Sequence, residues 1–402
     1  MSIDVERSGA TMELELRSDL VASAASLVPT LAANAARTES QRRLTGENIA
    51  VLEKAGLFGL MRPKRFGGLE AGFRTGLEVT RELARGCGST AWVVCHLNIC
   101  SWFAGMWNES AQRDVWEPHP ANRVAGVFAP TSSTTITAGG YLVTGSWSWC
   151  SGCLHAQWAL VGVPLTGAGG ELLDQGMVLI PMSELTIEDT WFAAGMKGTG
   201  SSTVVAKEVF VPEHRYLSAV KLMAGQTDNP YQHEALYRIP FMAGGTLNVV
   251  GPQLGLVRAA LDLAIQDANE RGIALSAYER KADAPTVQVA IAQAASLADS
   301  AELLAYRAAE TLDEAGARGV FPDRLTRARI RMDAGQAVVS AREAIRILVS
   351  AYGASGFAES SAMQRIWRDS EVASRHPSVN PDIGAQAYGQ ALLGIEDSAA
   401  LV

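Results

Sequence analysis

The spacing of apolar residues divides the chain into a helical, a strand-rich and a second helical part. From about residue 13 to 118, apolar side chains recur at the three- and four-residue spacing of an amphipathic helix. Within this part, residues 75–106 predict one long and largely buried helix. We therefore expect an N-terminal helical domain over residues 1–120.

The pattern changes between residues 121 and 225. Short apolar runs such as GGYLVTGSW and STVVAKEVFVP are separated by turn residues, and the Gly-rich segment TGAGGE interrupts them. This alternation is typical of strands. It predicts a small sheet domain in the middle of the chain.

Helical spacing returns over residues 226–402. A second uninterrupted periodic run covers residues 323–352. These helices are rich in Ala, and small residues let helices approach closely within a bundle or between subunits. We expect a C-terminal bundle and a homotetramer or homodimer. Before that second run, a first apolar stripe of the bundle consists of Val287, Ile291, Ala294, Ala298 and Ala301.

Composition narrows the class of protein. The 402 residues are 48% hydrophobic, enough to bury a large core. The 42 acidic and 34 basic residues leave a net charge of −8, so we expect no nucleic-acid partner. No run approaches the roughly 20 apolar residues of a membrane span, and the N-terminus lacks the apolar core of a signal peptide. We expect no membrane partner and a cytoplasmic location.

The five cysteines point to thiols rather than a disulfide framework. Cys150 and Cys153 form a CxxC motif, but no second CxxC or HxxxH follows to complete four zinc ligands. We therefore expect no metal site and interpret the pair as buried thiols.

Three segments combine small residues, hydroxyl groups and neighbouring tryptophans. This mixture is typical of the surroundings of a flat aromatic cofactor that accepts and donates hydrogen bonds. The segments are GVFAPTSSTTITAGGY, GSWSWCSGC and WFAAGMKGTGSS.

Five motifs resemble the acyl-CoA dehydrogenase superfamily and occur in the family order over nearly the whole chain. They are GLFGLMRPKRFGGLEAG, ELARGCGSTAWV, GGYLVTGSW, GMKGTGSSTVVAKEVFVP and YGASGFAESSAMQRIWRD. The resemblance implies a mostly α fold with a central β domain: an N-terminal helical domain, a middle β-barrel-like sheet domain and a C-terminal four-helix bundle.

Within this superfamily the chain resembles the flavin-dependent hydroxylases more than the dehydrogenases. GVFAPTSS lacks the usual Thr-Glu-Pro run of dehydrogenases, and GSWSWCSGC is similar to the hydroxylase pattern. Where dehydrogenases place a carboxylate after the Arg-Asp pair, this chain has ASRHPSVN with His376. A dehydrogenase without that general base loses its proton acceptor.

The resemblance therefore implies the oxygenase component of a two-component (group D) flavin-dependent monooxygenase. Such proteins use reduced flavin and O2, through a C4a-hydroperoxide, to hydroxylate an aromatic substrate. We favour reduced FMN, with FADH2 as the alternative, and a polycyclic or indolic substrate over a small phenol. No GxGxxG turn follows a strand, so a separate NAD(P)H:flavin reductase must supply the electrons.

The motifs also predict site residues. The catalytic candidates are His376, Ser151 and His96. For the substrate we name the two histidines with Asn98 and Cys100, although the histidine of related phenol hydroxylases aligns with Cys100 and not with His96. We interpret Arg368 and Asp369 as a structural ion pair. For the flavin the motifs indicate Trp149, Ser151, Gly152, Ala129, Thr131, Ser132, Gly200, Ser201, Ser202 and Arg280.

Two other interpretations stay open from the sequence. One is an acyl-CoA dehydrogenase or oxidase with FAD and a relocated base. The other is a helical flavin-binding scaffold without catalysis. Within the oxygenase class, oxygenation of nitrogen or sulfur and epoxidation also remain possible, and the sequence does not identify the substrate.

Overall fold

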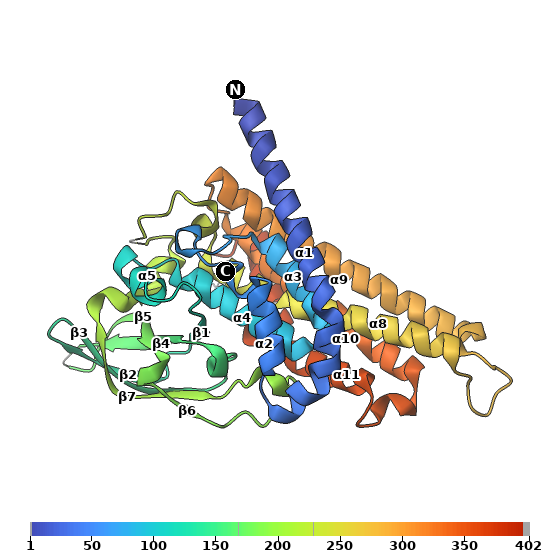
Figure 1. The fold of residues 1–402 in the computed structure, drawn as a ribbon. Coiled ribbons are helices and arrows are strands. Elements are labelled where there is room, and N and C mark those ends of the chain that lie inside the picture. Colours follow the sequence, from blue (N-terminus) through green and yellow to red (C-terminus); the bar gives the residue numbers. More distant parts are fainter. Residues whose placement is uncertain (1, 168, 228, 397–402) are drawn as a thin grey trace.

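The computed structural model describes residues 2–167, 169–227 and 229–396, and it shows two helical regions joined to a pair of sheets (Figure 1). This arrangement confirms the predicted mostly α fold with a central β domain. Its helices are α1 (Ser2–Gln41), α2 (Gly46–Lys54), α3 (Phe73–Gly86), α4 (Gly88–Ala104), α5 (Glu109–Trp116), α6 (Ala219–Met223), α7 (Phe241–Asn248), α8 (Val250–Glu270), α9 (Pro285–Arg318), α10 (Arg324–Tyr352), α11 (Ala362–Ala373) and α12 (Pro381–Leu392).

The helix expected over residues 75–106 is two helices, and this detail of the prediction was wrong. Cys87 adopts an extended backbone with φ −156° and ψ 112°, which ends α3 and begins α4. Gly86 lies directly against α1, since a Cβ atom there would come within 2.7 Å of the Val28 carbonyl oxygen. The bend lets α4 enter the centre of the molecule. Every residue of α4 except His96 is buried.

The middle of the chain forms two four-stranded sheets. One has the strand order β1-β4-β5-β8 and the other β2-β3-β7-β6, and all pairs are antiparallel except β1 with β4. The buried Trp147 joins the sheets, since its Nε1 donates to the Gly162 carbonyl oxygen at 2.9 Å. The strands are β1 (Val124–Val127), β2 (Ser132–Thr137), β3 (Gly140–Trp147), β4 (Trp158–Thr166), β5 (Leu172–Pro181), β6 (Thr186–Glu188), β7 (Thr203–Pro212) and β8 (Tyr216–Ser218).

The C-terminal region is a bundle in which the long helices α8, α9 and α10 run side by side, away from the sheets (Figure 1). In the predicted stripe on α9, Val287, Ala294, Ala298 and Ala301 are buried and Ile291 is partly buried. Alanine at these positions lets α9 and α10 pack closely.

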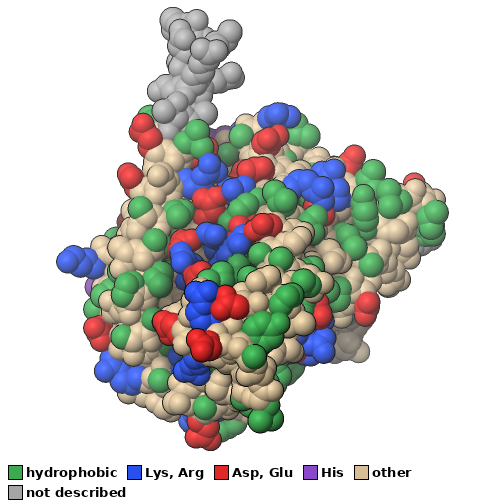
Figure 2. Space-filling view, turned by 90° about the vertical axis from the view of Figure 1, so that its right-hand side faces the viewer, with side chains coloured by type: hydrophobic (Ala, Val, Ile, Leu, Met, Phe, Trp, Pro, Cys, Tyr) green, Lys and Arg blue, Asp and Glu red, His purple; other side chains and the backbone are tan. Residues whose placement is uncertain are grey.

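The surface mixes charges of both signs. On the face shown in Figure 2, acidic and basic side chains are interspersed, with hydrophobic side chains between them. Among the described residues, no helix is both long enough and apolar enough to cross a membrane.

Candidate active site

Two histidines from distant parts of the chain meet beside a buried tryptophan. His96 lies in the middle of α4, and His376 lies between α11 and the short 3₁₀ helix Pro377–Val379. Their ring centroids are 5.7 Å apart, and Trp92 lies 4.5 Å from His96 and 5.7 Å from His376. Both histidines are partly buried. Trp92, which the sequence indicated only as core, is thus the shared wall of this histidine pair.

The two imidazoles present opposite hydrogen-bonding groups. The Nδ1 atom of His96 lies 3.0 Å from the Trp92 carbonyl oxygen, which can only accept, so this nitrogen carries the hydrogen and Nε2 is an acceptor. The Nδ1 atom of His376 accepts from the Ser378 backbone N–H at 3.3 Å and lies 2.6 Å from the Ser378 hydroxyl. Its Nε2 therefore carries the hydrogen and is a donor.

Both histidines are neutral at neutral pH. Burial and, to a smaller extent, the nearby His376 lower the pKa of His96 to about 3. Burial also lowers the pKa of His376 to about 4. A buried imidazolium would lose its hydration without gaining a carboxylate partner, so the uncharged form is favoured.

A chain of hydroxyl groups links this pair to the sheet domain. Trp92 Nε1 donates to the Ser151 hydroxyl at 3.1 Å, and that hydroxyl lies 2.8 Å from the hydroxyl of Ser201. Ser201 in turn contacts the Thr199 hydroxyl at 2.7 Å, and Thr199 donates to the Met196 carbonyl oxygen at 2.8 Å. Two predicted flavin residues, Ser151 and Ser201, are therefore brought together although 50 residues separate them.

Two turns hold these hydroxyls in place. Gly152 has φ +77° and Gly200 has φ +55°, a left-handed conformation that glycine adopts without steric cost. The two turns are bonded to each other, because the Ser202 carbonyl oxygen accepts from the Cys150 N–H at 3.1 Å and the Thr199 carbonyl oxygen accepts from the Gly152 N–H at 3.3 Å. Ser202 therefore helps to join the two turns through its backbone carbonyl oxygen.

Asp369 anchors the second turn from the C-terminal bundle. Its buried carboxylate accepts from the Met196 backbone N–H at 2.5 Å, and burial raises its pKa to about 6. Arg368 instead pairs with Glu39 at 2.7 Å and donates to the Ala194 carbonyl oxygen. The expected Arg368–Asp369 ion pair was therefore wrong, because adjacent residues on a helix point in different directions.

Several groups beside the Ser151 turn could contact a flat ring that has polar atoms along its edge. Trp149 is 70% exposed and has φ +67°, so an apolar ring faces outward directly before the Ser151 turn. The Ser132 hydroxyl is buried without a hydrogen-bond partner, and Ser132 pairs with Gly145 on the neighbouring strand. Ala129 and Thr131 are exposed beside it, and the Thr131 hydroxyl donates to the Ser146 carbonyl oxygen at 2.7 Å. These groups fit the ring of a flavin.

The surroundings of two predicted substrate residues, Asn98 and Cys100, restrict what each of them could do. Asn98 donates to the carbonyl oxygens of Leu57 and Val94 at 2.8 and 2.9 Å and accepts from the Met61 N–H at 3.3 Å. This geometry connects α4 to the loop after α2 and does not support a role for Asn98 in substrate binding. Burial raises the pKa of the Cys100 thiol to about 12, so Cys100 can contribute only a neutral wall.

An aromatic cluster that the sequence did not indicate lies farther along α4. Phe103 contacts Phe241 at a centroid distance of 4.4 Å and Phe128 at 4.8 Å. Phe128 is 41% exposed and directly precedes the predicted flavin segment at Ala129. The seven-residue spacing of His96 and Phe103, which places both on one face of α4, is the sequence feature that could have indicated this cluster.

Arg280 lies apart from this region. Its exposed guanidinium forms a bidentate pair with Asp283, with distances of 3.1 and 2.7 Å. A hollow of about 730 Å³ nearby is lined by Arg271, Lys281 and Tyr352 but not by Arg280. Its predicted contact with flavin phosphate therefore stays a prediction.

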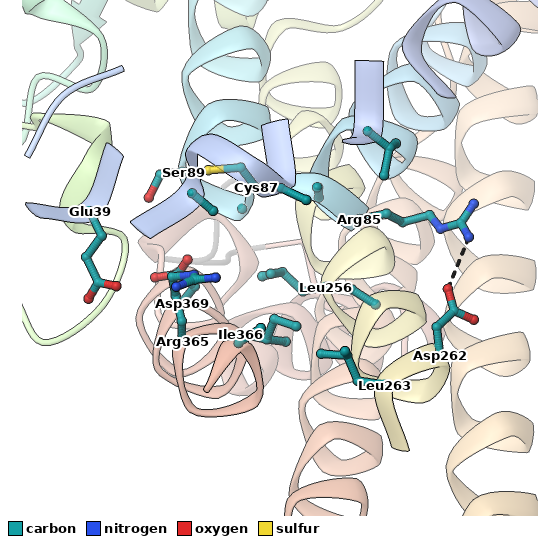
Figure 3. A pocket seen from close by; sticks show the side chains of 18 residues that line it. Glu39, Arg85, Cys87, Ser89, Leu256, Asp262, Leu263, Arg365, Ile366 and Asp369 are labelled. Carbon is teal, nitrogen blue, oxygen red and sulfur yellow. Dashed lines mark hydrogen bonds and ion pairs between the residues drawn. The ribbon is translucent and has the colours of Figure 1, made fainter. Parts of the chain in front are cut away.

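A second cavity, of about 240 Å³, is lined by residues of α1, α3, α4, α8 and α11 (Figure 3). Arg365 and Asp369 line it together, and Leu256 and Ile366 separate them from the Arg85–Asp262 ion pair. None of the residues predicted for flavin or substrate lines this cavity. The cavity therefore adjoins Asp369, which holds the Met196 turn, and is not part of the candidate site.

The fold and this arrangement define an acyl-CoA dehydrogenase-like flavoprotein. The family model described as acyl-CoA dehydrogenase, N-terminal domain, matches residues 15–122. The model described as acyl-CoA dehydrogenase, C-terminal domain, matches residues 247–381.

Similar proteins of known class are flavin-dependent oxygenase components. The chain is 34% identical over 372 residues to the flavin-dependent monooxygenase oxygenase subunit HsaA of Mycobacterium tuberculosis, covering 92% of this chain and 94% of that one. It is 32% identical to the FADH2-dependent resorcinol hydroxylase oxygenase component of a Rhizobium species, with 94% of each chain covered. The structure of XiaF from a Streptomyces species, in complex with FADH2 and glycerol, superimposes with a TM-score of 0.93 at 34% identity, covering 98% of this chain and 99% of that one.

This chain therefore belongs to the flavin-dependent monooxygenases of the acyl-CoA dehydrogenase fold, as an oxygenase component of a two-component system. The sequence-based prediction of class and fold is confirmed.

Proposed function

We propose that this oxygenase component binds reduced flavin against Trp149 and the Ser151 turn and hydroxylates an apolar aromatic substrate beside His96 and His376. The single observation that supports this most is the neutral histidine pair, in which one Nε2 accepts and the other donates. Such a pair can orient a polar substituent and the transferred oxygen at the same time.

We propose reduced FAD as the cofactor, with reduced FMN, which the sequence favoured, as the alternative. The names of the resorcinol hydroxylase and of the XiaF complex both include FADH2. When bound, the reduced flavin would supply the electrons that activate O2. Trp149 would cover the ring, and the hydroxyls of Ser132 and Ser151 would bond to its polar edge.

His96, His376 and Trp92 each have a separate role in this proposal. His96 accepts a hydrogen bond from a substrate O–H or N–H group through Nε2 and fixes the orientation of the substrate ring. His376 donates from Nε2 to the oxygen that is being transferred. Trp92 lies beside both histidines and excludes water from that side.

An aromatic substrate agrees with the cluster of Phe103, Phe128 and Phe241. Phe128 meets both other rings edge-on, at interplanar angles of 85° and 87°, which leaves part of its own ring exposed. Aromatic side chains of this kind favour stacking with a flat apolar molecule. Two relatives are named for p-hydroxyphenylacetate and indole-3-acetate, which are both aromatic.

We also propose two protein partners: a separate NAD(P)H:flavin reductase and further copies of this chain. The exposed face of α9 supports a homotetramer or homodimer, because it carries a stripe of uncharged side chains at three- and four-residue spacing. The stripe consists of Val289, Ala292, Ser296, Ser300 and Leu303.

The test supplies the purified protein with chemically reduced FAD, isotopically labelled O2, and indole or resorcinol as a probe. We expect a hydroxylated product with one oxygen atom from O2, and no oxidation of NADH by the chain alone. His96→Ala and His376→Ala should each lower the yield of product per O2 by at least about tenfold. His119→Ala, at an exposed position, is the control. Tightly bound FAD that is bleached by an acyl-CoA, with no aromatic product, would overturn the proposal.

A further inference from the structure

The CxxC motif lies in the turn that carries Ser151. The Cys153 N–H donates to the Cys150 carbonyl oxygen at 3.2 Å, and Gly152 has φ +77°. Residues 150–153 therefore form a β-turn, whose first and fourth Cα atoms lie within about 7 Å of each other. A disulfide needs a Cα separation of about 4.4–6.8 Å. The backbone thus already holds the two cysteines at a spacing that a disulfide can bridge.

The two thiols differ in their readiness to ionise. The hydrogen bond between them lowers the pKa of Cys153 and raises the pKa of Cys150, and backbone N–H groups at Ser202 and Leu154 also lower the pKa of Cys153. The Cys153 thiol donates to the Gly200 carbonyl oxygen at 3.5 Å, which leaves its sulfur free to accept from the Cys150 thiol. A thiolate is the nucleophilic form of cysteine, so Cys153 is the better placed of the two to react.

The other cysteines lack these features. Burial raises the pKa values of Cys87, Cys95 and Cys100. Cys95 is also bonded to Asn248, with its sulfur 3.2 Å from the Asn248 carbonyl oxygen. Each of the three is therefore a neutral thiol.

An oxidant arises next to this turn if the proposed function is right. Reduced flavin that reacts with O2 without a substrate yields oxidised flavin and hydrogen peroxide. Ser151, between the two cysteines, is the residue that we propose at the flavin. Cys150 and Cys153 are buried, but hydrogen peroxide is scarcely larger than water and would be released beside them.

We propose that Cys150 and Cys153 are a peroxide-sensitive modification site that forms a reversible disulfide. The Cys153 thiolate attacks one oxygen of hydrogen peroxide; an S–O bond forms, the O–O bond breaks, and the released hydroxide takes up a proton to give water. The Cys150 sulfur then attacks the Cys153 sulfur; the S–S bond forms, the S–O bond breaks, and a second water leaves with the Cys150 proton. Two thiols lose two electrons to one peroxide.

The disulfide would change the site through Ser151. The Ser151 hydroxyl is held at 3.1 Å from Trp92 Nε1 and 2.8 Å from the Ser201 hydroxyl. A bond between the two sulfur atoms constrains the backbone on both sides of Ser151. The oxidised protein should therefore lose oxygenase activity, and dithiothreitol should restore it.

The experiment treats the full-length protein, without flavin, with hydrogen peroxide, blocks the remaining thiols by alkylation and analyses the peptides by mass spectrometry. We expect the peptide with Cys150 and Cys153 to lose two hydrogen atoms and to escape alkylation, and dithiothreitol to reverse both changes. Cys87→Ser should behave as the wild type, and Cys153→Ser should form no disulfide in this peptide. Because flavin is absent, this result does not depend on the oxygenase function.

Three results would overturn the proposal. Both cysteines could remain alkylatable after peroxide treatment; Cys153 could be converted to a sulfinic acid while Cys150 stays a thiol; or the disulfide could join Cys100. The wild-type peptide alone distinguishes these results, so the conclusion stands even if Cys153→Ser does not fold.

Discussion

At the scale of single residues, His96 and His376 differ because their Nδ1 atoms meet different backbone groups. A carbonyl oxygen fixes the hydrogen of His96 on Nδ1, whereas an N–H group fixes that of His376 on Nε2. The sequence predicted both histidines as site residues. It could not predict that they would form a complementary pair, because 280 residues separate them along the chain.

The histidine pair should make stability depend on pH. The folded-state pKa values are about 3 for His96 and about 4 for His376, below the 6.5 of a free histidine. As the pH falls from 6.5 towards 4, the unfolded chain takes up protons that the folded chain does not, so the free energy of unfolding falls, by up to about 1.4 kcal/mol per pH unit for each histidine. Urea unfolding of the wild type and His376→Asn between pH 7 and 4.5 measures this.

The variant should lose less stability than the wild type on acidification, because the comparison cancels the contributions of groups that both proteins share. His119→Asn, at an exposed position, controls for the loss of a histidine. Equal slopes in all three proteins would contradict the assignment.

Trp149 combines backbone strain with exposure. A non-glycine residue at φ +67° costs about 1–2 kcal/mol, and the exposed ring returns little packing energy. Trp149→Gly should therefore leave the free energy of unfolding unchanged or raise it by up to about 1 kcal/mol. The affinity for reduced flavin should fall by at least about tenfold, measured by anaerobic titration.

Leu275→Gly is the matched control, since Leu275 is fully exposed at φ +59°. It should affect stability in the same direction and leave the affinity for flavin unchanged. A Trp149→Gly protein that binds flavin normally would remove Trp149 from the site.

At the scale of secondary-structure elements, two glycines set the distance between α3 and α8. A Cβ atom at Gly251 would lie 2.0 Å from the Thr80 hydroxyl oxygen, and one at Gly255 would lie 2.0 Å from the Arg81 carbonyl oxygen. Gly255→Ala should therefore separate the helices and lower the free energy of unfolding by roughly 1–3 kcal/mol. Gly76→Ala on α3, with no atom within 4 Å, should raise it by about 0.5–1 kcal/mol.

Chemical unfolding of the two alanine variants measures this contrast. The helix propensity of alanine is the same in both, so opposite signs can arise only from the surroundings. A stabilised Gly255→Ala protein would show that α3 and α8 can separate without cost.

The Met196 turn between β6 and β7 depends on one carboxylate of α11. Asp369→Ala removes the acceptor of the buried Met196 N–H and should lower the free energy of unfolding by about 1–3 kcal/mol. The loosened turn should also weaken binding of reduced flavin, because the same turn carries Thr199 and Ser201 and Thr199 donates to the Met196 carbonyl oxygen. Asp369→Asn keeps an acceptor oxygen and should restore both properties in part.

Glu371→Gln provides the control for this prediction. Glu371 is a carboxylate on the same helix that pairs with Arg375 and makes no hydrogen bond to Met196. If Glu371→Gln weakened flavin binding as much as Asp369→Ala, the effect would come from local charge and not from the turn.

At the scale of the whole molecule, the uncharged stripe on α9 predicts an assembly. Light scattering after size-exclusion chromatography should give a mass that is two or four times 42.6 kDa. Leu303 is 71% exposed, and Leu303→Asp would place a charge in the stripe and should shift the mass towards the monomer. Leu172→Asp, at an exposed position on β5, is the control, and a monomeric wild type would contradict the proposed assembly.

The sequence by itself determined the class of this protein. Periodicity located the helical and strand-rich regions, because the side-chain repeat of each element is a local property of the chain. Short motifs around Ser151, Ser201 and His376 indicated the oxygenase family, and the missing carboxylate near His376 separated it from the dehydrogenases.

Only the tertiary structure decided how the site is built. The contact of Ser151 with Ser201, the support of Met196 by Asp369 and the occupied amide of Asn98 all join segments that are distant in sequence. The break at Cys87 likewise depends on the approach of α1 to Gly86. Such contacts depend on packing between elements, which leaves no periodic signal in the sequence, and so motifs could identify candidate residues but not their partners.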